Sequence, residues 1–203
     1  GAITALAPDI VIANKEENRE RDVMALTEAG LPVYVTDPRT VTAAITTLTE
    51  LARLLDAVDV AGPLVEVMRA AYAATLAASA RLPQHARVLA LIWRDPWMAI
   101  GDDTYAADLL RMCGGINVAA ELDGRYPRFE LAALPTLRPD LILLPSEPYA
   151  FSAVDLPALR TVFDGPIHFV DGELLTWYGP RIPQALTTFS ALLCHATPPS
   201  GSH

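Results

Sequence analysis

The stretch from Thr40 to Leu82 constrains the fold most, because it is long, largely apolar and interrupted only once. Its hydrophobic residues recur at three- and four-residue steps, first from Val41 to Leu55 and again from Leu64 to Leu76, which is the spacing of two amphipathic helices. Pro63 suits the first turn of the second helix and Pro83 ends it, so about 20 residues span roughly 30 Å. The sequence therefore predicts a stiff helix, residues 59–83, that connects two other parts of the chain.

A similar unit stands on each side of this helix. Leu6–Ile12 and Leu137–Leu143 both read Leu-x-Pro-Asp followed by a short apolar run, and each leads through a helix-sized stretch to a second apolar run, Leu31–Asp37 or Gly165–Asp171. Apolar runs without alternation are typical of parallel strands that are covered on both faces. Chance is the alternative, since Pro-Asp before a hydrophobic run is common, but the matched second runs favour a repeated β-α-β unit.

The predicted fold class is α/β, with two Rossmann-like lobes of unequal completeness. The N-terminal lobe, residues 1–58, contributes only the strands Asp9–Ala13 and Pro32–Thr36, and two strands cannot form a well-covered sheet. We therefore expect either a truncated lobe or one whose missing strands come from elsewhere, for example from a second copy in a dimer. The C-terminal lobe, residues 84–203, has a further strand, Arg87–Trp93.

Composition narrows the class of protein. A chain of 203 residues with 52% hydrophobic and 19% charged residues is globular. No apolar run reaches about 18 residues, and no basic segment followed by an apolar one forms a signal peptide. A net charge of −9 argues against a nucleic-acid partner, for which a basic face is expected.

Aromatic residues gather where the strands end. The strand from Val88 to Trp93 runs into the loop Arg94–Trp97, at the carboxyl end of a parallel strand, where open α/β sheets bind their ligands. The aromatic residues in predicted loops or strand ends are Trp93, Trp97, Tyr126, Tyr149, Phe151, Trp177 and Tyr178. A single ring of this kind more often fills a small core under its loop, whereas several at one edge indicate a binding face for a large, flat or apolar ligand.

Three arginines lie near these loops, at positions 94, 128 and 181. A guanidinium group suits a carboxylate or phosphate of a ligand. Surface solubility is the equally good alternative for Arg94, Arg128 and Arg181.

The sequence contains no motif for catalysis. It lacks a Gly-x-Ser-x-Gly elbow, a phosphate-binding loop and a Gly-x-Gly-x-x-Gly turn, and its four histidines are not spaced as helical metal ligands. His168 lies in an apolar run and is expected to be a packed or sheet-edge residue rather than a ligand. Asp102 and Asp103 are expected to cap a helix rather than to form a carboxylate pair. The predictions are accordingly no enzyme, no metal site and no cofactor.

The order of these segments resembles the helical-backbone (class III) periplasmic substrate-binding proteins of ABC importers for cobalamin and iron-siderophores. The resemblance covers nearly the whole chain and is most specific at Val88–Met98 and Leu174–Arg181, with Asp103–Tyr105 and Arg125–Arg128 between them. It implies two lobes bridged by a stiff helix, a ligand held between them with little hinge closing, and binding without chemistry.

The resemblance also implies site residues and partners. The ligand contacts would be Trp93, Arg94, Trp97, Tyr126, Arg128, Tyr149, Trp177, Tyr178 and Arg181, and the ligand a corrinoid or, as the alternative, a ferric siderophore or haem-like chelate. The permease of an ABC transporter would dock at Glu130, the acidic residue nearest to the family's position. The chain begins where the N-terminal lobe of the family offers its own glutamate, and Gly1 or Ala2 stands there.

The implied location is the periplasm or a membrane-anchored extracellular position. Two alternatives remain: a cytoplasmic ligand-binding module, and a two-lobe α/β enzyme such as a sugar-nucleotide transferase, against which the missing phosphate-binding glycines argue.

Cys113 and Cys194 are the only cysteines. We expect their helices to be neighbours. In the resembling proteins cysteines can occur at these two places and be bridged, and a bridge would close a loop of about 80 residues. The alternative is two free thiols that act as small apolar residues.

Overall fold

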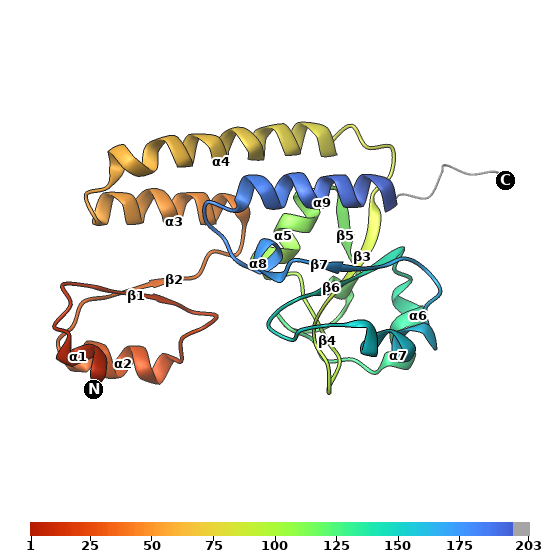
Figure 1. Cartoon of the computed structure of the whole chain (residues 1–203), viewed down its shortest axis with the longest axis horizontal. Coiled ribbons are helices and arrows are strands. Elements are labelled where there is room, and N and C mark those ends of the chain that lie inside the picture. The colour runs from red at the N-terminus through yellow and green to blue at the C-terminus, as the bar shows by residue number, and fades with distance from the viewer. Residues whose placement is uncertain (197–203) are drawn as a thin grey trace. The chain divides into compact units, whose positions relative to one another are not determined.

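The computed structural model describes residues 1–196, and for residues 195 and 196 it describes the backbone alone. The chain divides into two compact units, unit 1 (residues 1–38) and unit 2 (residues 39–203), each of which is described by itself (Figure 1).

Unit 1 is a small β-α-β arrangement. It consists of α1 (Ala2–Ala5), β1 (Val11–Asn14), α2 (Glu20–Glu28) and β2 (Val33–Thr36). The two strands are parallel, in a register that pairs Val11 with Val33 and Asn14 with Thr36. They form a two-stranded sheet, and the side chains of Ile12 and Val35 are both 45% exposed. The predicted strand pair is thus present, with apolar side chains that unit 1 itself does not cover.

The core of unit 2 is a five-stranded sheet. Its strands are β3 (Ala86–Trp93), β4 (Met98–Ala99), β5 (Gly115–Asn117), β6 (Leu141–Pro145) and β7 (Ile167–Val170). They run in the order β4-β3-β6-β7, with β5 also paired to β3. All pairings except that of β3 with β4 are parallel, so β3, β6 and β7 have their carboxyl ends at one edge of the sheet.

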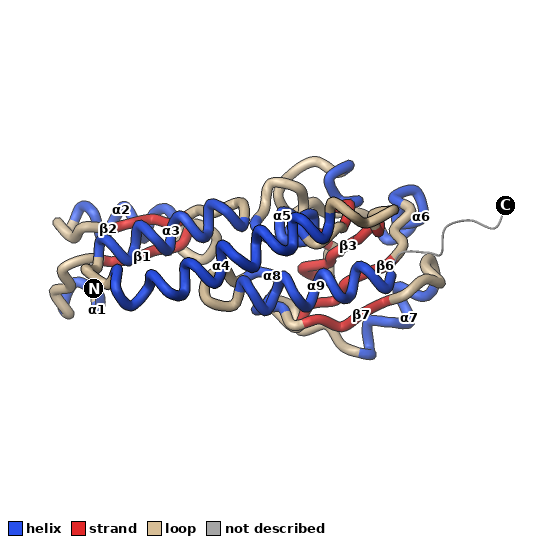
Figure 2. Tube along the Cα trace, turned by 90° about the horizontal axis from the view of Figure 1, so that it is seen from above, coloured by secondary structure: helices blue, strands red, loops and turns tan. Residues whose placement is uncertain are grey.

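Helices cover both faces of this sheet (Figures 1 and 2). One face carries α5 (Tyr105–Met112), α8 (Gly172–Thr176) and α9 (Ile182–Ala196). Helix α4 (Val58–Ser79) packs on α9, and α3 (Val41–Leu54) packs against α4 and α5. The other face carries the 3-10 helix η1 (Val118–Glu121) and the short helices α6 (Leu134–Leu137) and α7 (Leu156–Arg160), with further 3-10 turns η2 (Leu131–Ala133) and η3 (Ala153–Asp155) before them.

Each face has its own hydrophobic cluster, because successive residues of a strand point to opposite sides. Val88 and Ala90 of β3 belong to the cluster under α4, α5 and α9, here called the helix-side cluster. Leu89 and Leu91 belong to the cluster with α6 and α7, here called the loop-side cluster. All four residues are fully buried. The prediction of a parallel strand covered on both faces is confirmed for the run that ends in β6, where Leu141–Leu144 are fully buried, but it is wrong for β1, where Ile12 is 45% exposed.

Two boundaries differ from those predicted. Helix α3 was expected in the N-terminal lobe, residues 1–58, but it packs against α4 and α5, so unit 2 begins at Arg39. The connecting helix α4 begins at Val58, and Pro63 lies inside it rather than in its first turn. The reason for the first difference is that Val41, Ala44 and Ile45 of α3 are buried in the helix-side cluster.

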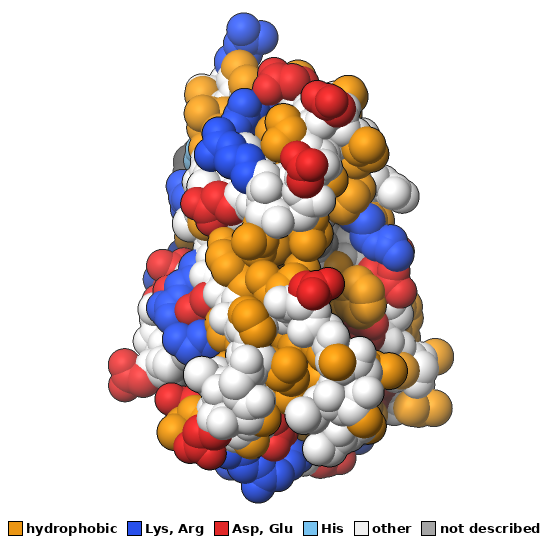
Figure 3. Space-filling model, turned by 90° about the vertical axis from the view of Figure 1, so that its left-hand side faces the viewer, with side chains coloured by type: hydrophobic (Ala, Val, Ile, Leu, Met, Phe, Trp, Pro, Cys, Tyr) orange, Lys and Arg blue, Asp and Glu red, His pale blue; other side chains and the backbone are white. Residues whose placement is uncertain are grey.

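Large hydrophobic side chains are exposed where α3 turns into α4. Leu54, Leu55, Val58 and Val60 are all about half exposed or more. Figure 3 shows hydrophobic side chains between charged ones on this side of the molecule. Within the described residues, no helix combines the length and the apolar character needed to cross a membrane.

Candidate functional site

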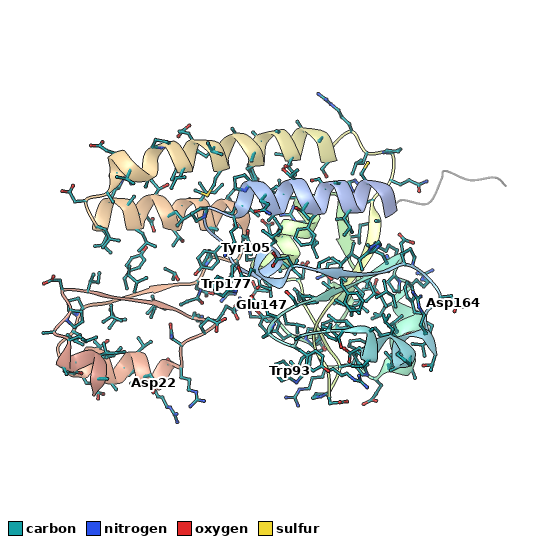
Figure 4. The ribbon with its side chains drawn as sticks, viewed as in Figure 1. Asp22, Trp93, Tyr105, Glu147, Asp164 and Trp177 are labelled. Carbon is teal, nitrogen blue, oxygen red and sulfur yellow. The ribbon has the colours of Figure 1, made fainter. Side chains whose placement is uncertain are left out.

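The candidate site is the edge of unit 2 at which β3, β6 and β7 end. Trp93 is the last residue of β3, Glu147 follows the end of β6 by two residues, and Trp177 follows the short helix α8 that comes after β7. In Figure 4 these three side chains lie toward the same end of the sheet, whereas Asp164, which precedes β7, lies at the opposite end. Parallel strands explain this arrangement, because their carboxyl ends meet at one edge. The sequence prediction of a common edge for these loops agrees with the geometry.

Two tryptophans of this edge are open to solvent. Trp93 is 41% exposed and Trp177 is 53% exposed. The guanidinium of Arg181 lies 6.0 Å from the centroid of the Trp177 ring, and its Nη2 atom is 2.6 Å from Oε2 of Glu173. Large exposed aromatic rings at a loop edge are suited to an apolar ligand face.

Other aromatic residues support Trp93 from within the loop-side cluster. The Tyr149 ring meets Trp93 edge-on at 5.7 Å between centroids and meets Phe151 at 4.7 Å. Phe151 in turn stacks on Trp97 at 6.4 Å. Tyr149 and Trp97 are partly buried and Phe151 is buried, so these rings chiefly hold the loops in place.

Tyr126 and Tyr178 belong to the other side of the sheet. Both pack against the helix-side cluster, where the rings of Tyr178 and Tyr105 meet edge-on at 5.8 Å. Tyr105 is 6% exposed, and its hydroxyl group is buried without a hydrogen-bond partner. Burial raises the pKa of Tyr105 well above its usual value. The structure therefore divides the predicted aromatic residues between two clusters on opposite faces of the sheet.

The predicted arginines differ in their partners. Nη1 of Arg94 donates a hydrogen bond to the buried carboxylate of Asp155, and Arg181 pairs with Glu173. Arg128 is exposed, and its backbone bridges Met98. Two of the three arginines are thus already compensated by carboxylates within unit 2.

Sequence reasoning missed Asp155. Its carboxylate accepts hydrogen bonds from the Ser152 backbone N–H at 2.8 Å and the Tyr149 hydroxyl at 3.2 Å, besides the one from Arg94. The signal was present, because Ser152-Ala-Val-Asp155 has the spacing of a capping box, and the structure shows both of its hydrogen bonds. Its distant partner Arg94 could not be read from this local pattern.

The aspartates before α5 have a different role from the predicted cap. The side chain of Thr104 caps α5, its Oγ1 accepting a hydrogen bond from Ala107 N at 3.2 Å. Asp103 instead pairs with Arg39, and its backbone oxygen accepts from Nε of Arg125 at 2.8 Å. The N-cap prediction for Asp102 and Asp103 was wrong by one residue, because Thr104 is the residue with extended backbone at the helix start.

Glu130 is exposed at the start of η2. The preceding residue, Phe129, donates its backbone N–H to the oxygen of Trp97 at 3.1 Å, which places Glu130 beside the Trp93–Trp97 loop. His168 is partly buried in β7. His203 and the side chain of His195 lie outside the described part of the chain. Within the described part, no three side chains of His, Cys, Asp or Glu lie close enough together to hold a metal ion.

Of the two alternatives for Cys113 and Cys194, a bridge or two free thiols, the structure has two free thiols, and α5 and α9 contact each other as predicted. Sγ of Cys113 lies 3.5 Å from the backbone oxygen of Leu186. Eight residues separate Leu186 from Cys194, about 12 Å along a helix, and cysteine Cα atoms more than about 7 Å apart cannot be joined without moving the backbone. Burial raises the pKa of the Cys113 thiol to about 11, while Cys194 is exposed.

Comparisons with known proteins bear on the family and the fold of the chain. Residues 2–152 match the sequence profile of the family described as periplasmic binding protein. The vitamin B12-binding protein of Salmonella typhimurium is 29% identical over 142 residues, which are 70% of this chain and 53% of that protein. The chain spans about half the length of the curated relatives that it matches.

Two solved structures show the same fold. The periplasmic vitamin B12 binding protein BtuF of Vibrio cholerae has a TM-score of 0.80 at 18% identity, covering 96% of this chain and 77% of that one. The periplasmic heme-binding protein RhuT from Roseiflexus sp. RS-1, in its apo form, has a TM-score of 0.77 at 23% identity, covering 96% of this chain and 78% of that one. The α/β fold class predicted from the sequence is confirmed.

Proposed function

Because this chain belongs to the periplasmic binding protein family, we propose that it is the ligand-binding component of an ABC importer for a metal chelate, with a corrinoid as the leading ligand. It holds its ligand without catalysing a reaction. The ligand is the cargo, and no resident cofactor takes part.

The observation that carries this proposal is the pair of exposed tryptophans, Trp93 and Trp177, at the edge where the strands of unit 2 end. Their rings offer apolar area to one face of a macrocycle, and burial of that area is worth roughly 25 cal/mol per Å², less the cost of ordering both partners. The similarity to the Salmonella vitamin B12-binding protein supports a corrinoid. Tyr149 supports Trp93 from the loop-side cluster, to which Trp97 also belongs, whereas Tyr126 and Tyr178 pack on the helix-side cluster.

A haem or a ferric siderophore is the second candidate. It is supported by the fold shared with the Roseiflexus heme-binding protein. Both kinds of ligand are broad and carry apolar surface, so exposed aromatic rings suit either. The two candidates differ in charge, because haem carries two carboxylates whereas the side chains of the corrin ring end in neutral amides.

The proposal includes a location and partners. The family's name supports the periplasm, with attachment to the membrane as part of the proposal. Glu130, exposed beside the Trp93–Trp97 loop, is the proposed contact for the transporter permease.

The proposal also includes a dimer in which a second copy completes the sheet of unit 1. The exposed side chains of Ile12 and Val35 support it. The mass of the protein in solution tests it.

The direct test is a titration of the purified protein with cyanocobalamin, haemin and ferrichrome. Binding is followed by the absorbance spectrum of each chelate and by quenching of tryptophan fluorescence. The proposal expects at least one chelate to bind stoichiometrically with a perturbed spectrum. If no chelate binds to folded protein, the proposed function is wrong.

A further inference from the structure

Asp155 is the only fully buried carboxylate among the described residues, and one of its partners, Tyr149, contacts Trp93 of the candidate site. Both of its oxygens are used. Oδ2 accepts from the backbone N–H of Ser152 at 2.8 Å, whereas Oδ1 accepts from Nη1 of Arg94 and from the Tyr149 hydroxyl at 3.2 Å. Three donors from two different loops therefore converge on one carboxylate.

Two of the three donors of Asp155 contact the tryptophans of the Trp93–Trp97 loop. The guanidinium of Arg94 lies 5.4 Å from the centroid of the Trp97 ring, and the ring of Tyr149 meets Trp93 at 5.7 Å. Phe151 connects the two pairs, because it touches both Tyr149 and Trp97. A change at Asp155 would thus affect Trp97 through Arg94 and Trp93 through Tyr149.

Asp155 also neutralises the charge of Arg94. Burial by itself raises the pKa of this carboxyl group, but the hydrogen bonds from Ser152, Arg94 and Tyr149 outweigh burial, so the pKa of Asp155 lies below its usual value. The carboxylate is ionised at neutral pH, and the Arg94 side chain is only 26% exposed. The positive charge of Arg94 is consequently compensated inside the protein.

Arg181 shows the same compensation on the other loop of the edge, where it pairs with Glu173 at 2.6 Å. Asp95, with a side chain that is 88% exposed, adds a negative charge 3.8 Å from Nε of Arg94. Along these two loops the positive charges of Arg94 and Arg181 are therefore balanced by negative ones.

We propose that Asp155 is a positioning residue of the ligand edge, which holds Arg94 and Tyr149 beneath Trp97 and Trp93 and makes this part of the edge selective for an uncharged ligand face over a carboxylate. This inference rests on the proposed function. It assigns to Arg94 a packing role in place of the carboxylate-binding role expected from the sequence.

The test compares affinities for haemin, which carries two carboxylates, with those for cyanocobalamin, whose corrin amides are neutral. Asp155→Asn keeps the shape of the side chain but removes the buried negative charge beside Arg94, so that only the exposed Asp95 remains near its guanidinium. The ratio of the haemin Kd to the cyanocobalamin Kd should fall by roughly fivefold. Ser152→Ala, which removes the hydroxyl of the capping box but no charge, should lower stability and leave the ratio unchanged.

A double variant keeps the test decisive where Asp155→Asn does not fold. In Arg94→Gln with Asp155→Asn both charges are removed, so the ratio should equal that of the unchanged protein. A selective loss of haemin affinity in the double variant would show that Arg94 is a carboxylate anchor and would overturn the inference. So would an unchanged ratio in folded Asp155→Asn.

The two proposals fail in different ways. If the unchanged protein binds neither haemin nor cyanocobalamin nor ferrichrome, the proposed function fails and the ligand selectivity fails with it. If the unchanged protein binds a chelate and the ratio does not move in folded Asp155→Asn, only the role of Asp155 is wrong.

Discussion

The backbone N–H of Val41 donates a hydrogen bond of 2.8 Å to Oδ2 of Asp108, a residue 67 positions further along the chain. Val41 is the first residue of α3, and Asp108 lies in α5. The side chain of Thr40 caps the same helix end by accepting from Ala43 N at 3.0 Å. Helix α3 is therefore capped once by its own N-cap residue and once by another helix, which ties it to unit 2.

Asp108→Ala should lower the free energy of unfolding by about 1–3 kcal/mol, because the buried N–H of Val41 loses its acceptor. The matched control is Glu66→Ala, which removes an exposed carboxylate 3.0 Å from Arg69 and should change stability by less than about 0.5 kcal/mol. Urea unfolding followed by circular dichroism measures both. Equal losses in the two variants would contradict a capping role for Asp108.

The two thiols should differ in reactivity. Cys194 is exposed, whereas Cys113 is buried and its pKa is raised from near 9 to about 11, so at pH 8 its reactive thiolate is scarce. Iodoacetamide at pH 8 should add one group to the native protein, at Cys194, and a second only after unfolding, as read by intact and peptide mass spectrometry. Cys113 should gain reactivity only as the pH approaches 11.

The same experiment tests the bridge implied by the family resemblance. If protein recovered from its native compartment takes up no iodoacetamide even after unfolding, and two groups after reduction, then the cysteines are joined there.

Trp177→Ala should weaken chelate binding by about tenfold or more, because an exposed aromatic anchor is lost from the proposed site. The melting temperature should stay nearly unchanged, since the side chain is 53% exposed. Ile116→Ala is the control: Ile116 is 45% exposed but pairs with Arg87 near the start of β3, at the other end of that strand from Trp93. Equal binding by the two variants, measured by fluorescence titration, would remove Trp177 from the site.

Gly172 is expected to tolerate no side chain. It begins α8, and an added Cβ would lie 2.7 Å from the Glu147 nitrogen and 2.9 Å from the Glu147 oxygen. Gly172→Ala must therefore push α8 away from the β6 loop, at a cost of roughly 1–3 kcal/mol, and should weaken ligand binding because Trp177 follows α8.

Gly62→Ala is the matched change, since an added Cβ at this position in α4 meets nothing within 4 Å. It should stabilise the protein by about 0.5–1 kcal/mol through the helix propensity of alanine. Thermal unfolding compares the two variants. A Gly172→Ala protein as stable as the unchanged one would show that the loop yields without cost.

The elements of unit 2 were predictable where the pattern is local. The apolar runs of β3 and β6 and the three- and four-residue spacing of α3 and α9 need no knowledge of distant contacts. The unit boundary was not predictable, because it depends on the burial of Val41 against α5 and on the hydrogen bond to Asp108. The sequence also placed Pro63 in the first turn of its helix. In the structure α4 begins at Val58 and continues past Pro63, because the helix packs within unit 2.

The candidate site was predictable as an edge but not as a set of contacts. The position of Trp93 follows from the end of β3, which the sequence marks clearly, whereas Trp177 lies beyond α8, which separates it from the end of β7. The pairing of Arg94 with Asp155 joins residues 61 positions apart, and no local pattern specifies it. Sequence reasoning therefore assigned Arg94 to the ligand, whereas its strongest partner is within the protein.

The rings of the ligand edge are anchored in both hydrophobic clusters, Tyr178 in the helix-side cluster and Tyr149 in the loop-side cluster. Side chains held in this way have already lost most of their rotational freedom before a ligand arrives. Each side chain that must be immobilised on binding costs about 0.5–1.5 kcal/mol, and here that cost falls on folding instead. The candidate site in unit 2 is thus preorganised, so that a ligand meets side chains whose conformational entropy has already been reduced.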